Sequence, residues 1–95
     1  MGKAVVWSPV AESDLAAIVE YIALDNFKAA MELARSIVDA VEVGLVDQPH
    51  MGRHGRVSGT RELVVHKNYI VVYRVTESEI QALMVLHAAM RFPRV

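Results

Sequence analysis

The sequence predicts an α+β fold of two layers, in which a helical hairpin packs on one face of a mainly antiparallel sheet. Three observations predict it. Apolar residues recur at helical spacing between residues 11 and 45, β-rich segments fill most of residues 61–87, and only short connections separate these elements. The expected order is β-α-α-β-β-β. Because the apolar stripes of the helices must be buried, the sheet is their expected partner layer.

The first strand and the first helix are expected within residues 3–24. Residues 3–7 are a short β-rich run, and the Ser8-Pro9 pair that follows is typical of an N-cap with proline at the first helical position. Apolar residues then follow at spacings that place them on one helical face: Ala11, Leu15, Ile18 and Ile22. This helix is expected to end near Leu24.

The second helix is predicted from a cap at Asp25 or Asn26 to about Asp47. Its buried stripe repeats every three or four residues and comprises Ala30, Leu33, Ile37, Val41 and Leu45. Pro49 then stops the helix, because proline has no backbone N–H to donate. The short link between the two helices predicts a helical hairpin.

Residues 50–95 are expected to form a loop followed by three strands. Residues 50–59 hold three glycines without an apolar pattern, which is typical of a loop. Strands are predicted over residues 61–66, 69–75 and 80–87, with tight turns between them and a short tail from residue 88. Because the connections are so short, the three strands should pair as an antiparallel meander.

Composition limits the class of protein. A chain of 95 residues is expected to form a single domain, residues 1–95. No apolar run approaches the roughly 18 residues of a membrane-spanning helix, the N-terminus does not resemble a signal peptide, and cysteine is absent, so we expect a cytoplasmic protein. Hydrophobic residues nevertheless make up 54% of the chain. This surplus predicts an apolar surface that a partner covers.

Charge is divided unevenly along the chain. Residues 1–49 carry three basic and eight acidic side chains, whereas residues 50–95 carry seven basic and three acidic side chains and all four histidines. The basic second half indicates an anionic partner. The acidic first half also fits a simpler interpretation, in which the outer faces of paired helices are solvated.

Several stretches of the sequence resemble the RelE/ParE superfamily of bacterial toxins. They are Trp-Ser-Pro-Val-Ala at residues 7–11, Gly-Thr-Arg-Glu-Leu at 59–63, the aromatic strand at 66–75, and Val-Leu-His-Ala-Ala at 85–89 followed by Phe-Pro at 92–93. The resemblance covers nearly the whole chain. It implies the fold predicted above and a toxin of a type II toxin–antitoxin system, bound by a cognate antitoxin in a hetero-oligomer. RelE-like members cut messenger RNA on the ribosome, and ParE-like members poison DNA gyrase.

The resemblance also points to candidate catalytic residues. Cleavage of RNA by its 2′-hydroxyl needs a general base, a general acid and cations around the phosphate. RelE-like toxins carry an arginine after an aromatic residue of the third strand, where this chain has Ile70. A YafQ-like branch of messenger-RNA interferases uses histidines instead, and similarity to it implies catalytic roles for His87 and His66. His50 or His54 could supply a third histidine of that set.

Other candidate residues would bind the target. The arginines of the basic half could hold phosphate groups or an acidic antitoxin, and Phe92 could stack on a base. These arginines are Arg53, Arg56, Arg61 and Arg74. Each histidine also has a structural interpretation: His87 could bond to backbone at a strand end, and His66 could be a solvated turn residue. We expect no cofactor and no metal site, because the histidines lack nearby carboxylates or cysteines at ligand spacing.

Three functions remain open on the sequence alone. The leading hypothesis is a metal-independent, ribosome-dependent endoribonuclease, which the basic half and His87 favour. The alternative is a ParE-type gyrase poison with no hydrolytic activity, which Ile70 and the formal net charge of −1 favour. The third is a degenerate toxin that only binds its antitoxin.

Overall fold

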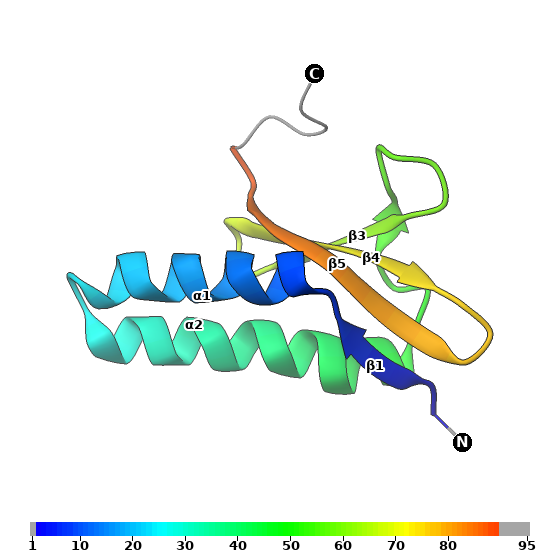
Figure 1. Ribbon diagram of the computed structural model, residues 1–95, viewed down its shortest axis with the longest axis horizontal. Coiled ribbons are helices and arrows are strands. Elements are labelled where there is room, and N and C mark those ends of the chain that lie inside the picture. The colour runs from blue at the N-terminus through cyan, green and yellow to red at the C-terminus, as the bar shows by residue number, and fades with distance from the viewer. Residues whose placement is uncertain (1, 90–95) are drawn as a thin grey trace.

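A helical hairpin and a five-stranded sheet form the two predicted layers in the computed structural model, which describes residues 2–89 (Figure 1). The helical elements are α1 (Pro9–Ala23), α2 (Phe27–Asp39) and η1 (Ala40–Leu45). The strands are β1 (Ala4–Trp7), β2 (Arg53–His54), β3 (Arg61–Val65), β4 (Tyr69–Val75) and β5 (Glu79–His87), and they lie in the order β1-β5-β4-β3-β2. Among the described residues, no helix has the length and apolar character needed to cross a bilayer.

Both helices begin where the sequence predicts. The Ser8 hydroxyl accepts a hydrogen bond from the backbone N–H of Ala11 at 3.0 Å, and the side-chain oxygen of Asn26 accepts one from Ala29 at 3.0 Å. Each bond satisfies a backbone donor that the first helical turn leaves without a partner. Ser8 and Asn26 are therefore the N-caps of α1 and α2.

The helical stretch predicted to run to about Asp47 changes its geometry part-way. The α-helix α2 ends at Asp39, and η1 continues the chain as a π-helical segment. The buried stripe extends through it, because Val41 and Leu45 are fully buried. The apolar spacing correctly predicts which residues face inward, but it does not distinguish these two helical geometries over six residues.

The sheet contains the predicted antiparallel meander and two additional pairings. Strands β3, β4 and β5 pair antiparallel in chain order. Strand β1 lies parallel to β5 at one edge of the sheet, with Val5 opposite Ile80. At the other edge, β2 pairs with β3, although the sequence predicts only a loop at residues 50–59. A strand of two residues is too short to show the alternation by which strands are predicted.

Helix α1 protects the part of β5 that β1 does not reach. The Ser8 hydroxyl donates to the carbonyl of Leu83 at 2.8 Å, and the carboxylate of Asp14 accepts from the N–H of Val85 at 3.0 Å. The register of β4 with β5 shifts by one residue at Leu83, which forms a bulge at the same place. These bonds satisfy backbone groups that an open strand edge would offer to another chain.

The core lies between the helices and the inner face of the sheet, which is the face toward the hairpin. The predicted stripe of α2 and η1 is buried there through Leu33, Ile37, Val41 and Leu45. The sheet contributes Val65, Val71, Tyr73, Ile80, Ala82 and Val85. Predicted residues of α1 pack against the same core as partly buried side chains: Leu15, Ile18 and Ile22. The outer face holds a smaller buried cluster of Ile70, Val72 and Leu86.

The replacement Ile37→Ala should lower the free energy of unfolding by about 2–5 kcal/mol, because it leaves a cavity at a fully buried position. Urea unfolding measures this loss. The matched control is Val43→Ala in η1, where the side chain is 66% exposed and the loss should stay below about 0.5 kcal/mol. Equal losses in the two variants would contradict the packing of the stripe on the sheet.

Candidate functional site

The candidate side chains gather at two opposite ends of the sheet. We define the β2 end by Arg53, Arg56 and Arg61, and the turn end by His66 and His87. Arg61 pairs with Tyr73 across β3 and β4, whereas His87 pairs with Tyr69 across β5 and β4. Four residue steps of β4 separate these two pairings, which is about 13 Å at 3.3 Å per residue. The fold therefore does not bring His66 and His87 together with Arg53, Arg56 and Arg61.

A buried carboxylate organises the β2 end. Glu62 is 1% exposed, and its Oε1 accepts a hydrogen bond from Nη2 of Arg53 at 3.1 Å. Its Oε2 accepts two bonds from Arg56, one from the backbone N–H at 2.9 Å and one from Nε at 3.1 Å. The side chains of Arg53 and Arg56 remain 59% and 41% exposed. Both arginines thus have a structural partner, and both can still contact a ligand.

Glu62 is a residue that the sequence did not single out. Burial acts to raise the pKa of its carboxyl, but hydrogen bonds from Arg56 and Arg53 outweigh that effect and lower the pKa below its ordinary value. Glu62 is therefore ionised at neutral pH. An acidic residue in a strand is usually solvated, so the run Arg-Glu-Leu-Val-Val contains no signal of this burial.

Tyr73 and Arg61 hold the segment that follows the helices. The buried hydroxyl of Tyr73 donates to the carbonyl of Pro49 at 2.8 Å and accepts from the N–H of Gly52 at 2.9 Å. Burial raises the pKa of Tyr73, so the hydroxyl keeps its proton. Nη1 of Arg61 donates to the carbonyls of His50 and Gly52 at 3.3 and 2.8 Å. A Cβ at position 52 would lie 2.7 Å from the Tyr73 oxygen, so glycine is required there.

At the turn end, His87 lies in a shallow hollow between the sheet and α1. Its ring meets the ring of Tyr69 edge-on, with centroids 5.3 Å apart and an interplanar angle of 82°. The hollow is completed by Ala17, Ile18 and Tyr21. His87 is exposed, and its Nδ1 accepts a hydrogen bond from the N–H of Ala89 at 3.1 Å. An accepting ring nitrogen carries no proton, so the neutral ring holds its proton on Nε2.

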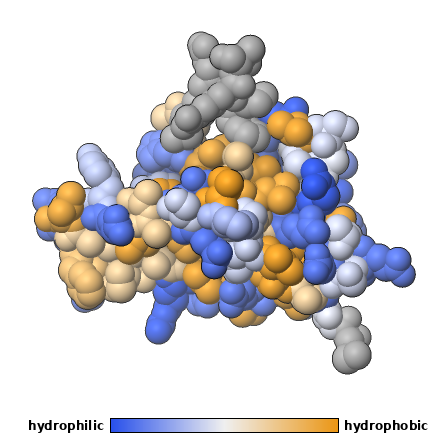
Figure 2. All heavy atoms as spheres, viewed as in Figure 1, coloured by the Kyte–Doolittle hydropathy of each residue, from blue (hydrophilic) through white to orange (hydrophobic). Residues whose placement is uncertain are grey.

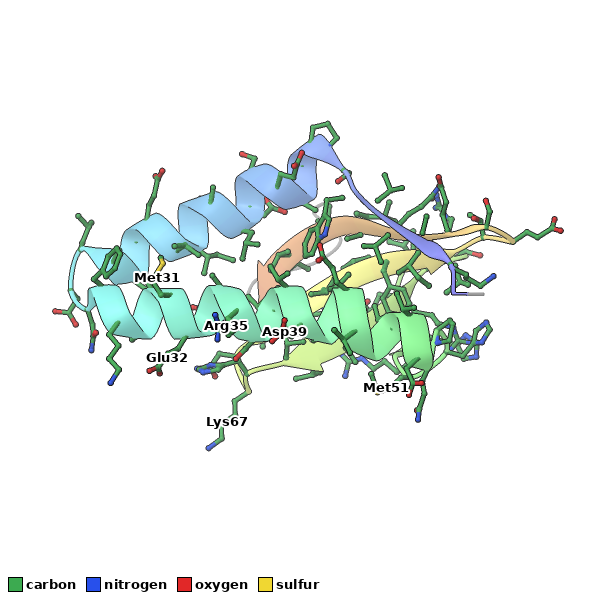
Figure 3. All side chains as sticks on the ribbon, turned by 90° about the horizontal axis from the view of Figure 1, so that it is seen from below. Met31, Glu32, Arg35, Asp39, Met51 and Lys67 are labelled. Atoms are coloured by element: carbon green, nitrogen blue, oxygen red, sulfur yellow. The ribbon has the colours of Figure 1, made fainter. Side chains whose placement is uncertain are left out.

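The remaining candidates are dispersed. His66 is exposed and begins the β3–β4 turn with a φ of 51°, followed by Lys67 with a φ of 60°. Figure 3 shows Lys67 projecting from this turn. Arg74 is exposed on the outer face, as strand alternation predicts, and Phe92 lies outside the described residues. Within residues 2–89, no three His, Cys, Asp or Glu side chains are grouped as a metal site requires.

Comparison with known proteins places the chain in a family. Residues 5–92 match the family described as the ParE toxin of the type II toxin–antitoxin system parDE. The chain is 36% identical over 94 residues to "Putative toxin Y4kP" of Sinorhizobium fredii, covering 98% of this chain and 96% of that protein. It is 34% identical over 85 residues to toxin RelE2 of Caulobacter vibrioides, covering 90% and 94% of the two chains.

A solved structure extends the comparison to the fold. A chain of the chromosomal ParDE toxin–antitoxin system from P. aeruginosa superposes with a TM-score of 0.80 at 26% identity, covering 90% of this chain and 95% of that one. The hairpin on a mixed sheet and these matches together define a small toxin of the type II class. The chain belongs to the ParE/RelE family of type II toxin–antitoxin toxins. The matched family and this relative belong to toxin–antitoxin systems, which implies that the chain has a cognate antitoxin.

The replacement Glu62→Gln should lower the free energy of unfolding by about 1–3 kcal/mol at pH 7, because a neutral amide cannot make charge-assisted bonds to both arginines. The folded-state pKa of Glu62 is lowered, so its contribution is complete above the ordinary pKa of 4.5 and is lost as the pH falls through the folded value. The difference in the free energy of unfolding between wild type and variant should therefore become smaller below pH 4.5.

Urea unfolding at pH values above and below 4.5 measures this difference in the free energy of unfolding. The matched control is Glu32→Gln, at an exposed position on α2 that Figure 3 labels. Its stability should stay within about 0.5 kcal/mol of wild type. Glu62→Gln could instead lose the same free energy of unfolding at neutral pH and well below pH 4.5. That result would contradict the assignment of a stabilising, ionised Glu62.

Proposed function

We propose that this toxin arrests growth as a ParE-type poison of DNA gyrase and does not hydrolyse RNA. Family membership supplies the role of toxin and the antitoxin partner. The identity of the target, DNA gyrase, is the part that we propose. The observation that carries it is the separation of His66 and His87, the histidines to which catalytic roles are assigned, from Arg53, Arg56 and Arg61.

Cleavage of RNA requires an acid, a base and cations that reach the same phosphodiester, and hydrogen-bond reach is about 2.6–3.2 Å. The strand pairings of Arg61 and His87 lie about 13 Å apart along β4. Arg61 is also bonded to two backbone carbonyls, and Glu62 holds Arg53 and Arg56 at the same end. This arrangement favours a target that is bound over a surface rather than cut at a point.

The hydrogen bond at His87 supports the same proposal. A general base needs a free lone pair, and Nδ1 of His87 already accepts from Ala89. In this geometry Nε2 is the ring nitrogen that is left to contact a target.

The position that carries an arginine in RelE-like toxins also favours binding without cleavage. Ile70 is 4% exposed and packs with Val72 and Leu86 on the outer face of the sheet. His87 lies on the inner face, in the same alternation as Tyr69 and Val71. An arginine in place of Ile70 would have to bury its charge in this apolar cluster, which is costly.

A messenger-RNA interferase remains the second candidate, and the turn end is the observation that favours it. His87 shares a hollow with two tyrosines, Tyr69 and Tyr21, and aromatic rings can stack on unpaired bases. His66 and Lys67 occupy the neighbouring turn. These residues could contact an RNA strand.

Induction in cells distinguishes the two functions. Wild type should accumulate gyrase-linked DNA breaks while translated messages keep their ends, and His87→Ala should still produce breaks because no proton transfer is required. Antitoxin co-expression is the control and should suppress the breaks. Cleaved messages with wild type, reduced about 10²–10⁴-fold by His87→Ala, would contradict the proposal and establish the interferase.

The antitoxin surface can also be proposed. The tip of the hairpin, where α1 joins α2, exposes four large apolar side chains: Tyr21, Leu24, Phe27 and Met31, at 79%, 87%, 68% and 42%. Figure 2 shows apolar atoms covering much of this end of the molecule, on its left. Exposed apolar patches of this kind mark protein contacts. We infer that the cognate antitoxin covers this tip.

The replacement Phe27→Glu should weaken antitoxin binding at least tenfold, because a carboxylate would be buried in the complex. Titration calorimetry with the purified antitoxin measures the affinity. The matched control is Val57→Glu, at a 37% exposed position in the loop before β3, which should bind like wild type. Unchanged affinity of a folded Phe27→Glu variant would show that the tip is not the antitoxin surface.

A further inference from the structure

The β2 end holds a second hollow, at the opposite end of the sheet from the hollow that contains His87. It is lined by His50, His54, Gly59, Thr60, Arg61 and Val75, and its volume is about 230 Å³. A water molecule occupies about 30 Å³ of the liquid, so the hollow has room for a small anion and part of its hydration shell. None of its lining residues is acidic. Three of them carry nitrogen donors.

The positions of these donors are fixed by the fold. His54 and Arg61 are opposite each other in the pairing of β2 with β3, so their side chains leave the same face of the sheet. This is the inner face, because Arg61 is also opposite the core residue Tyr73. His50 belongs to the segment that the Tyr73 hydroxyl and Arg61 tie to the sheet. The fold therefore fixes the backbone positions of all three residues.

The donors are also unsatisfied. Arg61 uses only Nη1 for its bonds to the carbonyls of His50 and Gly52. Within the part of the chain that the structure describes, its Nε and Nη2 have no partner, and neither does the imidazole of His50 or His54. A guanidinium and two imidazoles thus line one hollow of a chain whose formal net charge is −1.

We propose that His50, His54 and Arg61 form a binding site for a phosphate group. The free edge of the guanidinium can donate two parallel bonds to an oxyanion, and each imidazole can add one N–H donor. A phosphate group places its oxygens tetrahedrally around phosphorus, so donors can approach it from different sides, whereas the two oxygens of a carboxylate lie in one plane. This tetrahedral arrangement is shared by a nucleic-acid backbone, which has two charged oxygens, and by free phosphate. The site is independent of whether gyrase or messenger RNA is the target.

NMR titration of the full-length protein tests the site. Inorganic phosphate should cause saturable shifts of the Arg61 side-chain N–H and of both imidazoles. The double variant His50→Ala/His54→Ala should weaken phosphate binding at least tenfold while keeping the wild-type melting temperature, since neither ring has a protein partner within residues 2–89. The single variant His50→Ala provides a second, milder test. Arg61→Ala is unsuitable because Arg61 holds the adjoining segment.

The matched control is Lys28→Ala/Arg35→Ala, which removes two exposed side chains of α2 and more positive charge than the test variant does. Figure 3 shows Arg35 on α2 and Met51, the neighbour of His50, beyond the far end of that helical stretch. Phosphate affinity of this control should stay within twofold of wild type, which would show that the effect is local.

The source of the phosphate is tested with a short RNA lacking terminal phosphates. Shifts of the same three side chains by this RNA, lost in the double variant, identify a nucleic-acid backbone as the ligand. Binding of inorganic phosphate without RNA binding identifies a small phosphate compound. The proposal is overturned if phosphate causes no saturable shift, if the double variant binds phosphate like wild type, or if acetate binds as tightly as phosphate.

Discussion

The hydrogen bonds of the buried Tyr73 hydroxyl connect the sheet to the segment that follows the helical layer. The ring of Tyr73 lies in the core under the helices, and its oxygen bonds to the carbonyl of Pro49 and the N–H of Gly52. Leaving a buried polar group without its partner costs about 1–3 kcal/mol, so these hydrogen bonds strongly restrict the path of residues 49–52. That path delivers β2 to the edge of β3. The position of the arginines and histidines that follow depends on it.

The arrangement of charged side chains around β2 depends on these hydrogen bonds of Tyr73. Once β2 is placed beside β3, Glu62 becomes buried between Arg53 and Arg56, and these two arginines lie at the same end of the sheet as Arg61. Figure 1 places the hairpin tip and β2 at opposite ends of the molecule. The proposed antitoxin surface and the cationic surface are therefore distinct. His66 and His87 lie at the opposite end of the sheet from Arg53, Arg56 and Arg61.

The elements with strong local patterns could be predicted from the sequence. The caps Ser8 and Asn26, the stripe through Ile37 and the antiparallel meander follow from short-range rules of spacing and turn chemistry. Features that depend on distant segments could not be predicted. The burial of Glu62 requires the fold of residues 53–56, and β2 is too short to carry a pattern. The catalytic roles of His87 and His66 and the binding role of Phe92 stay predictions, because no contact in the described residues tests them.

The proposed activity is the binding of a target without its cleavage. The most direct measurement uses one purified toxin preparation in two parallel reactions: DNA gyrase supercoiling a relaxed plasmid with ATP, and ribosomes translating a defined message. A gyrase poison should inhibit supercoiling, trap gyrase–DNA breaks and leave the message intact. A message cut during translation, with supercoiling unaffected at the same toxin concentration, would contradict the proposed activity.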